Sequence, residues 1–305
     1  MNFRDYQIAA LETEQLSSGG SADEPTAGLV VPLLGLAGEV GQLLTEYKKH
    51  LRDGHAHSAF KERVSEELGD LLWYVANVAS KFELDLDEVA ARNLIKTTQM
   101  WPKPPRLPYR FDSGLPAPEM LPRVLVVEFA ETTIDGRPQV RVSVNGEVLG
   151  SLLSDNAYDP DGYRFHDAFH LAYAAILGWS PNLRAFLKRK RKSLPLVDEV
   201  EDGGRARILE EAIAALAFDY AAAHGFLEGV AELDYRLLRT IKSMTAHLEV
   251  SACSAADWQH AILAGFSVWR RLMRDRGGVV RIDLDARSIE FLGRSSERSA
   301  NSPSS

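Results

Sequence analysis

Apolar residues in the first hundred positions recur every three to four residues, in four segments separated by polar stretches. These segments span residues 3–16, 35–51, 60–82 and 84–100. That spacing places the apolar side chains on one face of a helix, so each segment predicts an amphipathic α-helix. The stretch 17–28 is rich in Ser and Gly and predicts a loop. Four helices with short connections indicate a small helical bundle over residues 1–101.

The composition changes at the end of this region, where a proline-rich segment begins. Seven prolines lie between Trp101 and Pro122. Proline at this density disfavours both helix interiors and central strands. Residues 102–122 are therefore predicted to form a linker that contains the domain boundary.

Beyond the prolines the apolar period becomes two, which predicts β-strands. Strands are expected over residues 123–134 and 139–150, with turn signals at Asp135-Gly136 and Asn145-Gly146. A closing hairpin is expected over residues 278–293, in a position to pair with the strands near residue 125. Helical periodicity dominates the sequence between these strands, in segments 163–178, 182–192, 206–225, 230–250 and 254–275.

Together these patterns predict a mainly α protein with two domains. The first is an all-α helical bundle at the N-terminus. The second is a C-terminal α+β domain over residues 123–294, mostly helical with a small antiparallel sheet. The tail, residues 295–305, is rich in Ser and Arg and is predicted to be disordered.

Charge and composition exclude several classes of function. The net charge of −8 argues against a nucleic-acid or membrane-surface partner, because those interfaces are basic. The single cysteine, Cys253, excludes an intramolecular disulfide. The longest apolar run, residues 28–38, is broken by Pro32 and is too short to span a bilayer. Since the N-terminus also lacks the apolar core of a signal peptide, a cytoplasmic protein is expected.

The second and third predicted helices carry acidic side chains one turn apart. Glu39, Gln42 and Glu46 follow one stripe of the first, and Glu67 and Asp70 lie on one face of the second. The apolar faces behind these groups, through which the two helices are expected to pack, comprise Leu36, Val40, Leu43, Leu44 and Tyr47, and Leu68, Leu71, Leu72 and Val75.

Oxygen ligands of this kind suit Mg²⁺, which is bound by carboxylates together with substrate phosphates. The alternative interpretation is a set of solvated helix charges, which is the usual meaning of such pairs. Two features favour a site: the acidic residues lie within apolar segments, and Gly35, Gly38 and Gly41 interrupt the helix. Close helix packing or the approach of a ligand would explain glycines that each cost roughly 1 kcal/mol relative to Ala.

The wording and order of GLAGEVGQLLTEYKKHL, EELGDLLWYVANVA and LDEVAARNLIK closely resemble the MazG-like all-α nucleoside triphosphate pyrophosphohydrolases. The resemblance covers about the first hundred residues. It implies hydrolysis of a nucleoside triphosphate to the monophosphate and pyrophosphate, with Mg²⁺ (or Mn²⁺) as cofactor, by a homodimer or homotetramer.

The resemblance also implies roles for particular residues. Glu39, Glu67 and Asp70 correspond to catalytic carboxylates and, with Gln42, to metal ligands. Gln42 departs from the family pattern, which has a second glutamate at this position; its amide oxygen can bind Mg²⁺ but brings no charge. Glu46, one turn further on, is a partial substitute if it faces inward. Residues expected near the substrate phosphates or base are Lys48, Lys49, Asn93 and Lys96, with Trp73 and Tyr74 as candidates for the base pocket.

In the second half, His166 and His170 are spaced i, i+4 on one helical face, which suits a divalent metal. The alternative is a pair of histidines that only form hydrogen bonds within packed helices. Further ligands could come from Glu199, Glu201, Glu210 or Glu211. Asp167 is about 100° round the helix from His166, so it is expected outside the immediate ligand set.

A basic run, residues 187–192, predicts a solvated helix end, with a phosphate or nucleic-acid contact as the alternative. The acidic turn over residues 197–205 is a candidate partner for this run. The segment as a whole is loosely similar to a C-terminal domain attached to some MazG-like proteins, a similarity that transfers no activity.

Three functions therefore remain open. The chain is a Mg²⁺-dependent nucleoside triphosphate pyrophosphohydrolase, which serves nucleotide-pool house-cleaning or regulation. Alternatively, it is a nucleotide-binding sensor that has lost turnover through Gln42 and regulates the second domain. In the third interpretation the second domain is an enzyme with a histidine-bound metal, and the bundle is a dimerisation module.

Overall fold

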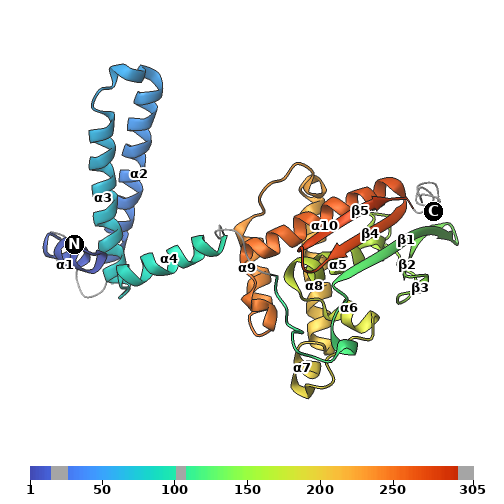
Figure 1. The fold of residues 1–305 in the computed structure, drawn as a ribbon. Helices are drawn as coiled ribbons and strands as arrows, with labels where there is room; N and C mark the ends of the chain where they lie inside the picture. The colour runs from blue at the N-terminus through green and yellow to red at the C-terminus, as the bar shows by residue number, and fades with distance from the viewer. Residues whose placement is uncertain (15–26, 101–107, 295–305) are drawn as a thin grey trace. The chain divides into compact units, whose positions relative to one another are not determined.

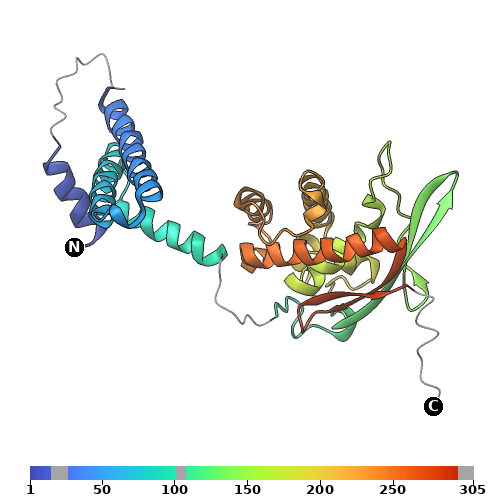
Figure 2. The same cartoon turned by 90° about the horizontal axis from the view of Figure 1, so that it is seen from above.

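A computed structural model describes residues 1–14, 27–100 and 108–294. The chain divides into two compact units, Met1–Thr98 and Gln99–Ser305 (Figures 1 and 2). The described part of the first is all helical, and that of the second combines helices with one antiparallel sheet. The predicted fold class is therefore confirmed.

The N-terminal unit is built on a hairpin of two long helices. α2 (Ala27–Asp53) and α3 (Phe60–Lys81) run antiparallel and are joined through a short 3₁₀ helix, η1 (Gly54–Ala56) (Figure 1). The other two helices are α1 (Phe3–Glu12) and α4 (Leu86–Met100). α2 begins well before the predicted start at residue 35 and runs through Pro32. Pro32 lies near the start of the helix, so the hydrogen bond that it lacks is confined to the second turn.

α1 is attached to the far end of α3 by hydrogen bonds from one side chain. The amide nitrogen of Gln7 donates to Ser80 Oγ (2.8 Å) and to the Leu84 carbonyl (2.9 Å). Its amide oxygen accepts the Leu86 N–H at 2.9 Å, at the first residue of α4. Gln7 therefore joins three helices, because both ends of its amide are used. Of the predicted loop 17–28, residues 17–26 lie outside the described residues, and Ala27 and Gly28 belong to α2.

The described part of the N-terminal unit buries little apolar surface. Its core cluster consists of Ala10, Ala76, Ala79 and Leu86. Five residues of the predicted packing faces are instead exposed: Val40, Leu44, Tyr47, Leu68 and Val75. α2 and α3 are in contact as expected, but they cover only part of the two predicted faces, because two helices in contact can cover only one stripe of each other.

One apolar segment of this unit passes a test for membrane spans. Leu29–Ala56 is long and apolar enough to cross a membrane on length and composition alone. The core helices of soluble proteins share this length and composition, although only 11% of its most apolar part is buried within the described residues. The segment therefore presents exposed apolar surface in a single chain.

The C-terminal unit contains a five-stranded antiparallel sheet with strand order β3-β2-β1-β4-β5. The strands are β1 (Val124–Ile134), β2 (Arg137–Val144), β3 (Glu147–Val148), β4 (Gly277–Asp283) and β5 (Ser288–Gly293). The predicted turns at Asp135-Gly136 and Asn145-Gly146 are confirmed, and all four residues have positive φ, as two-residue hairpin turns require. β1 pairs with β4 from Val124↔Asp283 onward, so the predicted pairing of the closing hairpin is also confirmed.

Two helices pack on this sheet and on each other: α5 (Asp167–Leu177) and α10 (Ala255–Asp275). Every residue of α5 is buried, which its nearly continuous apolar sequence explains. α10 approaches α5 closely at Gly265, where an added Cβ would lie 3.2 Å from that of Ala172. The remaining helices are α6 (Pro181–Phe186), α7 (Pro195–Val200), α8 (Gly204–Ala222) and α9 (Tyr235–Met244), with 3₁₀ helices η2 (Ala117–Glu119), η3 (Tyr163–Phe165), η4 (Gly225–Leu227) and η5 (Glu249–Ala252).

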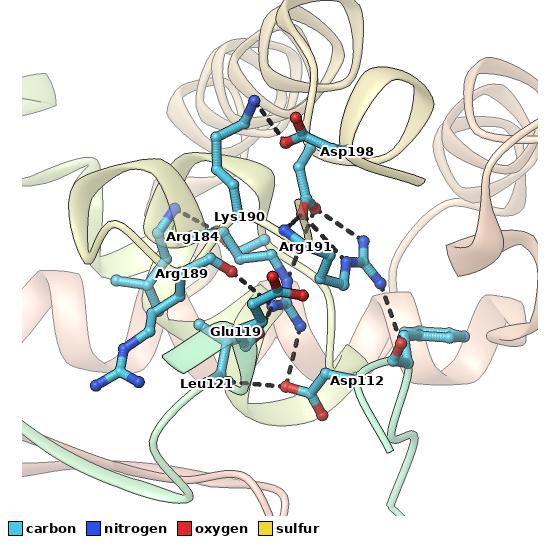
Figure 3. Close-up of polar contacts among 12 residues, drawn as sticks. Asp112, Glu119, Leu121, Arg184, Arg189, Lys190, Arg191 and Asp198 are labelled. Atoms are coloured by element: carbon cyan, nitrogen blue, oxygen red, sulfur yellow. Dashed lines mark hydrogen bonds and ion pairs between the residues drawn. The ribbon is translucent and has the colours of Figure 1, made fainter. Parts of the chain in front are cut away.

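The described part of the proline-rich segment, residues 108–122, packs on the C-terminal unit (Figure 3). Asp112 is buried and accepts hydrogen bonds from Leu121 N–H (2.8 Å), Arg123 Nη2 (2.6 Å) and Arg184 Nη2 (3.0 Å). The predicted linker 102–122 is thus too long, because the hydrogen bonds of buried Asp112 hold residues 108–122 on the C-terminal unit. Residues 102–107 of that prediction, and the predicted disordered tail 295–305, lie outside the described residues.

The basic run 187–192 is not the solvated helix end that its composition predicts. α6 ends at Phe186, and Arg191 is 1% exposed. The Arg191 guanidinium donates to both oxygens of Asp202 and both oxygens of Glu249 (Figure 3 shows its surroundings). Lys190 forms an ion pair with Asp198 at 2.9 Å. The predicted pairing of this run with the acidic turn is confirmed.

Candidate functional site

Three carboxylates from the two long helices converge in the N-terminal unit. Glu39 lies on α2, and Glu67 and Asp70 lie one turn apart on α3. One oxygen from each lies within 4.8 Å of the other two. Glu39 and Glu67 are half-buried and Asp70 is exposed, so the cluster is open to solvent on one side. The sequence-predicted pairing of the acidic turns therefore matches the observed geometry.

The electrostatics of this acidic cluster favour a bound cation. Burial raises the pKa of Glu67, and the hydrogen bond with Glu39 and the charges of Glu39 and Asp70 raise it further. Like charges at this separation repel unless a proton or a cation lies between them. Three oxygen donors from rigid helices, with an open side for substrate phosphates, fit the ligand preference of a small divalent ion.

Gln42 and Glu46 do not add a fourth carboxylate to the cluster. Gln42 is exposed on α2, one turn after Glu39. Glu46 is buried and accepts hydrogen bonds from Lys49 Nζ (2.5 Å) and His57 Nε2 (3.0 Å). The Lys49 hydrogen bond is the largest of the effects that lower the pKa of Glu46. Because its oxygens are engaged by these two hydrogen-bond donors, Glu46 is a poor substitute for the missing glutamate.

The four residues expected near the substrate are not gathered around the cluster. Lys48 is exposed and Lys49 is held by Glu46. Asn93 and Lys96 are exposed on α4, which leaves the base of the hairpin and runs away from it (Figures 1 and 2). Among the described residues of a single chain, therefore, the acidic part of the predicted site is assembled and these four residues are not.

The aromatic candidates for a base pocket have packing roles within the unit. Trp73 Nε1 donates to Thr13 Oγ1 at 2.8 Å and its ring packs beside the small core. The Tyr74 ring lies over Gly35, where a Cβ would approach it to 2.2 Å. Close packing thus explains Gly35. A Cβ at Gly38 or Gly41 meets nothing within 4 Å, so these two glycines leave open space beside Glu39.

Comparison with protein families assigns both units. The model of the MazG nucleotide pyrophosphohydrolase domain matches residues 32–103, and that of the MazG C-terminal domain matches residues 106–295. The chain belongs to the MazG family. The second match begins within the proline-rich segment, in agreement with the packing of residues 108–122 on the C-terminal unit.

A phage protein is similar to part of this chain. The chain is 39% identical over 93 residues to Gene 37 protein of Mycobacterium phage L5, a match that covers 30% of this chain and 81% of the phage protein. No solved structure matches the chain significantly. MazG domains imply nucleotide pyrophosphohydrolase-type activity, usually with a divalent metal, and the acidic cluster lies inside the matched segment.

The MazG C-terminal domain brings the two predicted histidines together with a carboxylate. His166 directly precedes α5, His170 lies one turn later, and both face α8. One ligand atom each from His166, His170 and Glu211 lies within 4.8 Å of the others. Of the further ligands that the sequence suggested, Glu211 is therefore brought to the histidines. Glu199 is exposed on α7, and Glu201 accepts the Glu249 N–H at 3.1 Å.

The neighbouring acidic residues of this histidine cluster have separate roles. Glu210 is fully buried and accepts from His170 Nδ1 at 2.9 Å. Burial opposes protonation of His170, but the charge and hydrogen bond of Glu210, together with the charge of Glu211, raise its pKa well above the ordinary value. Asp167 is also buried, and its Oδ1 lies 3.5 Å from His166 Nε2. Asp167 is thus closer to His166 than its position about 100° round the helix led us to expect. Burial raises the pKa of Asp167.

Proposed function

We propose that the N-terminal domain hydrolyses a nucleoside or deoxynucleoside triphosphate to the monophosphate and pyrophosphate, with Mg²⁺ as cofactor. The convergence of Glu39, Glu67 and Asp70 within 4.8 Å carries this proposal. Mg²⁺ is preferred over softer metals because the donors are all carboxylate oxygens, and Mn²⁺ shares that preference. Since the substrates are free nucleotides, we expect a cytoplasmic protein that acts on the nucleotide pool and has no nucleic-acid partner.

The carboxylates have distinct tasks in this reaction. Glu67, Asp70 and Glu39 would hold the cation, and the neutral Gln42 amide oxygen is available as a further ligand. When bound, the ion supplies positive charge that stabilises the phosphoryl oxygens and the departing pyrophosphate. The half-buried Glu39, on the opposite helix from the other two, is the proposed base.

The chemistry balances with one water per turnover. The water oxygen forms a bond to the α-phosphorus as the bond from that phosphorus to the bridging oxygen breaks. Pyrophosphate leaves with the bonding electrons, and the water proton passes to the Glu39 carboxylate. Lys48, Lys49, Asn93 and Lys96 are the proposed contacts for phosphates or base. Because α4 runs away from the hairpin, Asn93 and Lys96 would reach a site most simply from a second copy of the chain.

The test is to incubate the protein with Mg²⁺ and a panel of canonical and modified nucleoside triphosphates and to resolve the products by chromatography. We expect the monophosphate and pyrophosphate from at least one substrate, and EDTA should stop the reaction. Glu67→Gln and Asp70→Asn should each lower kcat on the order of 100-fold or more.

Glu66→Gln is the matched control, because Glu66 is exposed beside the cluster on the same helix and pairs with Arg63. It should retain wild-type turnover. Orthophosphate as the first product would contradict the proposal, and so would full activity in both cluster variants.

A further inference from the structure

In His166 and His170 of the C-terminal domain, Nδ1 forms a hydrogen bond within the protein. His166 Nδ1 lies 2.9 Å from the Tyr163 carbonyl oxygen, and His170 Nδ1 lies 2.9 Å from Glu210 Oε1. A carbonyl or carboxylate oxygen only accepts, so each Nδ1 carries the proton. In the neutral ring the lone pair then belongs to Nε2, which is the tautomer of a histidine that binds metal.

The acceptor of His170 is itself fixed by the surrounding helices. Glu210 also accepts from Ser180 Oγ at 2.6 Å and from the Asn182 N–H at 2.8 Å. Three donors in a fully buried site fix the orientation of this carboxylate. It is thus placed as the second-sphere carboxylate that usually orients a metal-bound histidine.

Two buried polar atoms in the histidine cluster have no hydrogen-bond partner. One is His170 Nε2, in a residue that is 1% exposed, and the other is Asp167 Oδ1. His170 Nε2 lies 3.2 Å from Glu211 Oε1 but without hydrogen-bond geometry. A buried polar atom without a partner is destabilising, so each of these atoms favours a ligand close to it.

The two histidines lie against different oxygens of Glu211, at separations close to those between neighbouring ligands of one metal ion. His170 Nε2 to Glu211 Oε1 is 3.2 Å, and His166 Nε2 to Glu211 Oε2 is 3.8 Å. Ligand bonds of about 2.0–2.1 Å at tetrahedral angles place neighbouring ligand atoms roughly 3.3 Å apart. The Glu211 side chain is 42% exposed, which leaves an entry path and room for water or substrate at a further position.

We propose that His166, His170 and Glu211 bind one divalent transition-metal ion, of the class of Zn²⁺, Co²⁺ or Fe²⁺, with Asp167 beside it and Glu210 orienting His170. Imidazole nitrogens select such ions over Mg²⁺, so this centre is chemically distinct from the all-oxygen cluster of the N-terminal domain. The rival arrangement is a protonated His170 between Glu210 and Glu211, with no metal.

Co²⁺ is the probe that separates the two arrangements. Full-length protein without a histidine tag is stripped with a chelator, dialysed and titrated with Co²⁺. We expect visible d–d bands of a four- or five-coordinate ion that saturate at one equivalent per chain and vanish on addition of Zn²⁺. Octahedral Co²⁺ bound only by oxygen absorbs weakly, so the acidic cluster does not produce this signal.

Two substitutions on the same helix make the test specific. Glu211→Ala removes a half-exposed ligand and should weaken Co²⁺ binding at least about tenfold. Asp219→Ala, at an exposed position of α8, is the matched control and should bind as the wild type does. His166→Ala and His170→Ala should abolish the bands, and circular dichroism establishes that each variant is folded.

The proposal is overturned if folded wild-type protein shows no such bands, which would identify the histidines as a salt-bridged pair. It is equally overturned if Glu211→Ala binds Co²⁺ with wild-type affinity. Failure of the N-terminal activity would leave this result unchanged, because the bands report only the C-terminal centre.

Discussion

The neutral side chain of Gln42 limits the negative charge of the acidic cluster in the N-terminal domain. Glu39, Glu67 and Asp70 supply three carboxylates within 4.8 Å, and Gln42 stands where the family pattern has a fourth. Glu46 does not replace that charge, because Lys49 and His57 hold it. In the proposed site, the affinity for Mg²⁺ would therefore depend on three charges and, at most, one neutral oxygen.

The substitution Gln42→Glu tests this dependence. Added negative charge at an exposed position one turn from Glu39 should tighten Mg²⁺ binding, by about 1 kcal/mol for one further charge near a solvated site. Turnover should rise or stay unchanged. The measurement is the Mg²⁺ dependence of pyrophosphate release, with isothermal titration of Mg²⁺ as a check on binding.

Gln42→Ala provides the comparison, since it removes the amide and leaves the charge count unchanged. A collapse of activity in folded Gln42→Glu would show that the site is built around the amide. Nucleotide binding without turnover in the wild type, with turnover restored by Gln42→Glu, would instead identify a nucleotide sensor.

The acidic residues could be predicted from sequence because helical spacing is a local property. Glu67 and Asp70 are three residues apart, so they lie on one face of any helix that contains both. This prediction does not depend on where the helix begins or ends. The unpartnered Nε2 of His170 could not be predicted, because it depends on Glu210 and Glu211 from α8, forty residues later in the chain. Spacing suggested the pair of histidines, and tertiary contacts selected Glu211 among four candidate acids.

Among the elements, the sequence predicted the strands and hairpin turns well and the proline-rich segment poorly. Period-two alternation and the Asp-Gly and Asn-Gly pairs are direct signals of a hairpin. Proline content indicates only the absence of regular structure. It carries no information on whether a segment packs, and here Asp112 binds Arg123 and Arg184 within the C-terminal unit.

The basic run 187–192 shows the same limit of composition. Six residues with five charges read as solvated, yet Arg191 is buried among Asp202, Glu249 and the Phe111 carbonyl. Arginine suits such a position because its planar guanidinium satisfies several acceptors at once. Arg191 thereby connects the turn between α7 and α8, η5 and the proline-rich segment.

Arg191→Ala should destabilise the C-terminal unit by about 3–5 kcal/mol, because it leaves the buried Asp202 and the partly buried Glu249 without their partner. Lys190→Ala, at the next residue, removes only the partly exposed pair with Asp198 and should cost less than about 1 kcal/mol. Urea denaturation followed by tryptophan fluorescence measures both. Equal stabilities of the two variants would show that the buried network contributes little.

At the scale of the whole molecule, the two units differ in how completely they bury their own apolar surface. The C-terminal unit has one extensive core that unites α5, α8, α10 and the sheet. The described part of the N-terminal unit has a core cluster of four small or aliphatic residues. On α2, the residues Val40, Leu44, Tyr47 and Leu51 form an exposed line at helical spacing, named here the α2 stripe.

A second copy of the chain is the proposed cover of the α2 stripe. The stripe adjoins Glu39 and the open space at Gly38 and Gly41, so a partner helix there would also complete the site. Sedimentation velocity of the wild type should therefore show a homodimer or homotetramer. Leu44→Glu should dissociate it and lower turnover, because it places a charge within the apolar surface that the second copy would cover, at a residue that is 62% exposed in one chain.

The control is Leu196→Glu on α7, at an exposed apolar position of the other unit, which should leave the assembly intact. A monomeric wild type that floats with anionic liposomes would show that a membrane covers the stripe instead, and an unchanged assembly in Leu44→Glu would remove the stripe from the interface.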